Sequence, residues 1–81
     1  MMQKVQVNNV KKNKRVLLVK ELPASKIFGN KNLLPKDARG DVTSEGFVAG
    51  SLKVKFYTHQ HGTENTQFSI DAALNFLQTD V

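Results

Sequence analysis

The chain has 81 residues, no cysteine and a formal net charge of +5. This length is enough for one domain with a small hydrophobic core, and the lack of cysteine excludes disulfide bonds and zinc sites built on thiolates. No apolar run approaches the roughly 20 residues of a membrane-spanning helix, and the first ten residues lack the apolar stretch of a secretory signal. We therefore expect a soluble, cytoplasmic protein that has no membrane partner.

The charge is distributed unevenly along the chain. Residues 1–40 contain ten Lys or Arg against two acidic residues, whereas residues 41–81 contain two Lys against five acidic residues. The first half therefore carries +8 and the second half −3. A basic end attracts anionic partners, which include both nucleic acids and acidic protein surfaces.

Residues 3–22 are expected to form a β-hairpin. Val5 and Val7 alternate with polar residues, and RVLLVKEL at 15–22 contains a β-branched and aliphatic run, so both stretches are typical of strands. Between them lies KKNKR at 11–15, in which Asn13 suits a turn with positive φ. This arrangement predicts four positive charges at or near the tip of the hairpin.

Residues 23–45 are predicted to form a long loop. Pro23 cannot donate a hydrogen bond to a strand ladder, so it ends the preceding strand. The stretch that follows is largely polar, contains Pro35 and Gly40, and shows no clear period from residue 30 onward. Long loops inside small domains are uncommon and are often functional or mobile.

Residues 46–59 are predicted to contain strands. GFVAG at 46–50 is a short strand or the start of the next one, with Gly50 as a bend. SLKVKFYTH at 51–59 alternates regularly and is the clearest strand of the chain. A turn is expected at 60–65.

Residues 69–79 are predicted to form a C-terminal helix. Ser69 is a good N-cap, and Asp71 lies in the first turn, where the helix dipole favours a negative charge. The helical spacing of its apolar residues gives one face that must pack on the sheet; these residues are Ile70, Ala73, Leu74 and Leu77. The predicted fold class is α+β, with a small antiparallel sheet of three or four strands and a C-terminal α-helix packed on one face.

The second face of this sheet is the principal candidate for a binding surface. Lys53, Lys55 and Tyr57 alternate with apolar residues and therefore point away from the core. Lysines neutralise phosphates, and a tyrosine can stack on an unpaired base. The alternative is an ordinary solvent-facing strand, in which lysines also discourage edge-to-edge aggregation.

The basic run at 11–15 has alternative interpretations of its own. It could contact phosphates as the tip of a β-ribbon, resemble a nuclear-targeting run, or be a solvated turn. If it contacts nucleic acid together with the strand face, the candidate nucleic-acid-binding residues are Lys11, Lys12, Lys14, Arg15, Lys53, Lys55 and Tyr57.

Other motifs offer little support for catalysis or for metal binding. His59 and His61 fall on one face of a strand, but a metal site needs further ligands that the sequence does not supply nearby. The tripeptide RGD at 39–41 is interpreted as a coincidence. There is no glycine-rich phosphate loop and no cysteine nucleophile, so we expect neither an enzyme nor a cofactor.

The sequence is compatible with two functions. The first is a small basic module that binds DNA or RNA. The alternative is a protein–protein interaction module, such as a small inhibitor or accessory protein of phage or mobile-element type, which docks on an acidic or nucleic-acid-binding surface of a larger partner. Apolar or aromatic anchors would then dominate binding, with Phe28, Phe47 and Tyr57 as candidates. A homodimer is a further partner to consider, because small chains gain stability by oligomerising.

Overall fold

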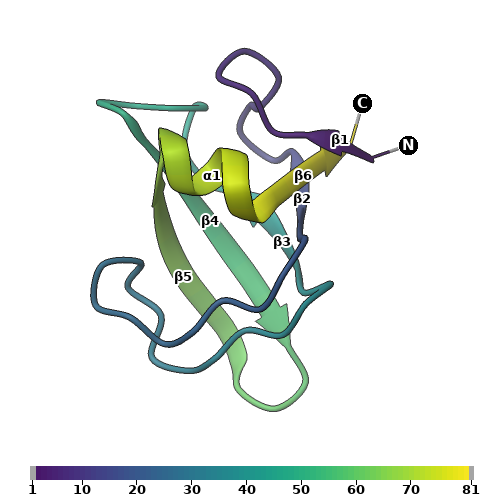
Figure 1. Cartoon of the computed structure of the whole chain (residues 1–81), viewed down its shortest axis with the longest axis vertical. Coiled ribbons are helices and arrows are strands. Elements are labelled where there is room, and N and C mark those ends of the chain that lie inside the picture. Colours follow the sequence, from purple (N-terminus) through teal and green to yellow (C-terminus); the bar gives the residue numbers. More distant parts are fainter. Residues whose placement is uncertain (1, 81) are drawn as a thin grey trace.

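The computed structural model describes residues 2–80 and contains six strands and one helix in that range. The strands are β1 (Met2–Lys4), β2 (Arg15–Leu18), β3 (Arg39–Val42), β4 (Ser51–Thr58), β5 (Gly62–Ser69) and β6 (Leu77–Asp80). The helix α1 (Ile70–Phe76) lies between β5 and β6 (Figure 1).

All six strands belong to one antiparallel sheet with the order β1-β6-β2-β3-β4-β5. The prediction of three or four strands was therefore wrong, although the C-terminal helix does pack on one face of the sheet. The additional strands lie where the sequence predicts a loop, a turn and the end of a helix. Each was missed because it carries few apolar residues.

The predicted hairpin at 3–22 does not form. Its first strand is shorter than expected, and β1 pairs with β6 at the other end of the chain, while β2 lies between β6 and β3. The two valines separate: Val5 is buried, whereas Val7 is 57% exposed. The turn itself is correct, since Asn13 has φ 72° and the Lys14 N–H donates to the Lys11 carbonyl at 3.0 Å.

The predicted loop at 23–45 contains β3, and the predicted strand at 46–50 is a turn. β3 is held between two longer-range partners, so its pairing does not depend on local sequence pattern. In the turn, Gly46 and Gly50 both have positive φ, which breaks the strand conformation.

The C-terminal region mixes correct and wrong predictions. β4 spans 51–58 as expected, but the predicted turn at 60–65 is mostly the first half of β5. Helix α1 begins after Ser69, whose hydroxyl accepts from the Ala72 N–H at 3.2 Å. The helix ends at Phe76 rather than at 79, because Leu77 turns back into the sheet as the first residue of β6.

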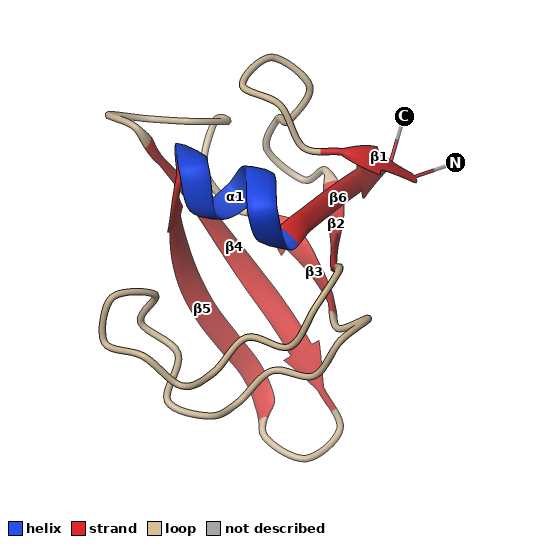
Figure 2. Ribbon diagram, in the orientation of Figure 1, coloured by secondary structure: helices blue, strands red, loops and turns tan. Residues whose placement is uncertain are grey.

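One face of the sheet is covered by two different segments. Figures 1 and 2 show α1 crossing one half of β4 and β5, and the connection from β2 to β3 crossing the other half. Phe56 and Phe68 lie at the centre of this layer, with ring centroids 6.1 Å apart. The fully buried side chains between the sheet and these two segments include Leu22 and Leu34 of the connection and Leu52, Val54 and Leu77 of the sheet.

Buried polar groups fasten the connection between β2 and β3 to the edge of β5. Glu64 is almost fully buried, and its carboxylate accepts from the Lys31 N–H at 3.1 Å and from the Asn32 amide at 2.6 Å. The Gln67 N–H donates to the Phe28 carbonyl at 3.0 Å. These contacts hold an otherwise irregular segment in one conformation, so the predicted long loop is an ordered layer of the fold.

Within residues 2–80, no helix has the length and apolar character needed to cross a membrane.

Candidate functional site

The candidate site is the sheet face opposite α1, which we call the open face. In an antiparallel pair, directly opposed residues share a face. One row of opposed residues therefore crosses from Leu17 through Arg39 and Tyr57 to Thr63, and the next crosses from Arg15 through Asp41 and Lys55 to Asn65. Lys53 opposes Gln67 in a third row of the same face.

The open face is predominantly basic at its centre. Its strands β2, β3 and β4 contribute Arg15, Arg39, Lys53 and Lys55 against one acid, Asp41. Adjacent strands lie about 4.8 Å apart, so the backbones of β2 and β4, which carry three of these cations, are roughly 10 Å apart. A single extended anionic chain can span that distance and meet several of these charges.

Tyr57 is the aromatic residue of the open face, and its side chain is 50% exposed. Its hydroxyl donates to Asp41 Oδ2 at 3.2 Å, across the pair of β3 and β4. This hydrogen bond, with smaller effects of desolvation and of the Asp41 charge, raises the pKa of Tyr57 above its ordinary value of 10.0. The phenol therefore stays protonated and held in position, while part of the ring remains available to a ligand.

Tyr57 lines two neighbouring depressions. The first has a volume of about 270 Å³ and is bordered by Arg15, Arg39 and Asp41. The second has a volume of about 290 Å³ and lies at the end of the sheet, where its wall includes Leu33, Pro35, Lys36, His59 and His61. The two depressions thus share Tyr57, and each is lined by a mixture of apolar and polar or charged residues.

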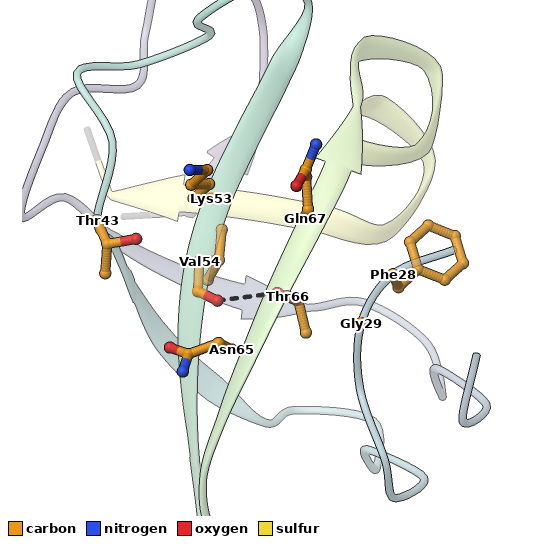
Figure 3. Close-up of a pocket in the computed structure, with 8 residues that line it drawn as sticks. All are labelled: Phe28, Gly29, Thr43, Lys53, Val54, Asn65, Thr66 and Gln67. Carbon is orange, nitrogen blue, oxygen red and sulfur yellow. Dashed lines mark hydrogen bonds between the residues drawn. The ribbon is translucent and has the colours of Figure 1, made fainter. Parts of the chain in front are cut away.

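A third depression lies at the edge of β5 and extends the polar surface away from Tyr57. Figure 3 shows Lys53 and Gln67 on adjacent strands, with Thr43 and Asn65 nearby and Phe28 on the separate segment beside β5. Its volume is about 270 Å³. The amides of Asn65 and Gln67 add donors and acceptors next to the lysines.

The structure divides the residues predicted from sequence into two groups. Arg15, Lys53, Lys55 and Tyr57 come together on the open face. Lys14 does not join them, because it follows the turn at Asn13 and lies opposite Val42, whose N–H donates to the Lys14 carbonyl and whose side chain is buried on the covered face.

Lys11 and Lys12 lie in the exposed turn that precedes β2. The Asn13 N–H donates to the Val42 carbonyl at 2.7 Å, which holds this turn beside the end of β3. The basic run at 11–15 is thus a turn beside the sheet rather than the tip of a projecting hairpin, and only its last residue, Arg15, belongs to the open face.

Sequence reasoning missed several residues of the open face, including Arg39, Asp41, Asn65 and Gln67. Arg39 was assigned to a loop, and Asn65 and Gln67 were assigned to a turn or to the residues after it, because β3 and β5 were not recognised. The alternation of buried Glu64, Thr66 and Phe68 with exposed neighbours is the signal for β5. It was hidden because two of the three buried residues are polar.

The other sequence motifs have simple structural positions. Phe28 and Phe47 pack against the core and are only partly exposed, which weakens the prediction that they anchor a partner. The tripeptide at 39–41 is β3, which is paired on both sides. His59 and His61 are exposed at the β4–β5 turn, and residues 2–80 contain no cluster of three or more side chains suited to hold a metal ion.

Comparison with known proteins gives no relative. No protein-family model matches the chain, and neither the curated proteins nor the solved structures include a significant match.

Proposed function

We propose that the chain is a small, non-enzymatic nucleic-acid-binding module that uses the open face. The observation that carries this proposal is the strand register, which gathers Arg15, Arg39, Lys53 and Lys55 around Tyr57 on the face that α1 leaves uncovered. Cationic side chains bind phosphates and release counterions, and an exposed aromatic ring provides a stacking surface for a base.

Asp41 is compatible with this proposal, although it carries the wrong charge for phosphate binding. Its carboxylate accepts the hydrogen bond of Tyr57 and opposes Lys55 across the strand pair. It therefore orients the ring and limits how closely a phosphate approaches the middle of the face. We expect phosphates to lie on either side of it, nearer to the arginines and to Lys53.

The test is a titration of the full chain with fluorescently labelled DNA and RNA oligonucleotides at two salt concentrations. If three or four phosphates are neutralised, the logarithm of the association constant should fall against that of salt with a slope of about −2 to −3 for a single strand. Lys53→Gln should make that slope shallower by about 0.7.

The matched control for Lys53→Gln is Lys20→Gln. Lys20 carries the same charge, but its ammonium lies 4.7 Å from the Phe76 ring centroid, beside the helix. We expect Lys20→Gln to leave the slope unchanged. An absence of binding at low salt, or equal effects of both substitutions, would contradict the use of the open face.

One observation favours the alternative of a protein-interaction module. Ile27 is 85% exposed at the tip of a segment that internal hydrogen bonds hold in place, including Gly29 N–H to the Ser25 carbonyl at 2.9 Å. An apolar side chain on a pre-organised loop is suited to a pocket of a protein partner. If the oligonucleotides do not bind, Ile27 is the first residue to substitute in a test of binding to a protein partner.

A further inference from the structure

The nature of the nucleic acid can be inferred from the surroundings of Tyr57. Resting on the function proposed above, we infer that the ligand is single-stranded and that one of its bases stacks on Tyr57 at the mouth of the depression formed by residues 33–38 and the β4–β5 turn.

The two depressions that share Tyr57 match the two chemical parts of a nucleotide. The one with Arg15 and Arg39 presents guanidinium groups, which bind phosphate oxygens in a bidentate geometry. The one at the β4–β5 turn offers Leu33, which is 47% exposed, and Pro35 for contact with a base, among polar and charged residues that include Lys36, Asp37 and Gln60. A base that stacks on the Tyr57 ring, between the two depressions, can place its sugar and phosphate next to Arg15 and Arg39.

The accessible surface of Tyr57 argues against a duplex as the preferred ligand. Stacking requires an exposed base face, and in a duplex the neighbouring base pairs cover both faces of each base. Duplex readers instead insert a helix or a two-stranded ribbon into the major groove. Here the helix has seven residues and packs on the covered face, and Tyr57 lies on β4, which is flanked by β3 and β5.

The chain carries its own reporter for this contact. Tyr57 is the only tyrosine, and there is no tryptophan. Intrinsic fluorescence above that of phenylalanine therefore comes from one residue in the proposed site. Stacking of a base on the ring should quench this emission, whereas phosphate binding elsewhere on the sheet should not.

The experiment compares oligodeoxythymidylate of about ten nucleotides, within the known range of single-strand site sizes, with a blunt duplex of equal total charge. We expect the single strand to quench Tyr57 emission and to bind at least about tenfold more tightly than the duplex at the same salt concentration. Tyr57→Ala should weaken single-strand binding by about five- to 150-fold, the range measured for one stacked base.

Two further variants keep the inference testable if Tyr57→Ala fails to fold. Tyr57→Phe retains the ring and loses only the hydrogen bond to Asp41, so it should bind within about threefold of the parent chain. Leu33→Ala shortens a side chain in the wall of the depression. It should weaken binding of the single strand severalfold and leave binding of the duplex unchanged.

The outcomes separate the two proposals. Salt-dependent binding of both oligonucleotides without quenching, or without an effect of Tyr57→Ala, would overturn the single-strand inference and leave a phosphate-binding open face. Tighter binding of the duplex would also overturn it. Failure of both oligonucleotides to bind at low salt would overturn the proposed function itself.

Discussion

Gly40 lies in β3 opposite Phe56, where there is no room for a Cβ, and we predict that Gly40→Ala is strongly destabilising. A Cβ at this position would lie 2.7 Å from the Lys55 carbonyl oxygen, 2.9 Å from Phe56 Cδ1 and 3.0 Å from Val54 Cγ1. The carbonyl oxygen belongs to a central strand, and both side chains are fully or almost fully buried. None of these three atoms can move without disturbing the sheet or the core.

The expected cost follows from this geometry. Overpacking a core typically costs about 1–3 kcal/mol, and three simultaneous close approaches put Gly40→Ala near 3 kcal/mol. A chain of this length has a free energy of unfolding of about 4–12 kcal/mol. The substitution should therefore remove a large share of the stability and lower the Tm by roughly 12–24 °C, at about 4–8 °C per kcal/mol.

Chemical and thermal unfolding followed by circular dichroism would measure this cost, with Gly50→Ala as the matched control. Gly50 has φ +77° but no atom within 4 Å of an added Cβ, so its substitution tests backbone strain without a clash. We expect it to cost about 1 kcal/mol. If Gly40→Ala lowers the free energy of unfolding no more than Gly50→Ala does, the predicted clash of a Cβ at Gly40 is wrong.

Three further predictions concern the cap, the loop anchor and the tyrosine. Ser69→Ala removes the acceptor for the Ala72 N–H and should cost about 1 kcal/mol in urea unfolding, whereas Ser69→Asp should retain most of the stability. Glu64→Ala removes two hydrogen bonds to a carboxylate and should cost about 2–4 kcal/mol, more than Glu64→Gln, which keeps one acceptor; equal costs would contradict the anchoring role. Asp41→Asn should lower the pKa of Tyr57 toward its ordinary value in a spectrophotometric titration of the phenolate. Because folding raises this pKa, the hydrogen bond stabilises the fold below the ordinary pKa, and that contribution is lost as the pH rises through the folded value.

The features that could be predicted from sequence are those with local physical causes. The alternation of Leu52, Val54 and Phe56 identified β4, because each of these side chains needs the same apolar layer. Ser69 marked the start of the helix because capping involves only the next three residues. For the same reason Lys53, Lys55 and Tyr57 were assigned correctly to one face.

The missed strands depend on contacts between distant parts of the chain. β3 has only four residues, including a glycine, and its pairing on both sides compensates for a weak strand propensity. β5 buries Glu64, whose partners at Lys31 and Asn32 come from a separate segment. The burial of this carboxylate cannot be predicted from the local sequence, because its hydrogen-bond donors come from a distant loop.

The open face was only half predicted, for a related reason. The row that contains Tyr57 also contains Arg39, and the row that contains Lys55 also contains Arg15. These neighbours are set by strand order, which the hairpin hypothesis placed incorrectly. Charge along the sequence predicted a basic region, but only the register identified which charges share a surface.

The pairing of β1 with β6 brings the two ends of the fold together, since Met2 opposes Asp80 at one corner of the molecule (Figure 1). A short peptide that joins these ends would bridge neighbouring strands without crossing either face. New ends could then be opened in the exposed turn at Lys11 and Lys12, which lies outside the open face. A circular permutant of this kind would keep all five strand pairings, because no strand is interrupted.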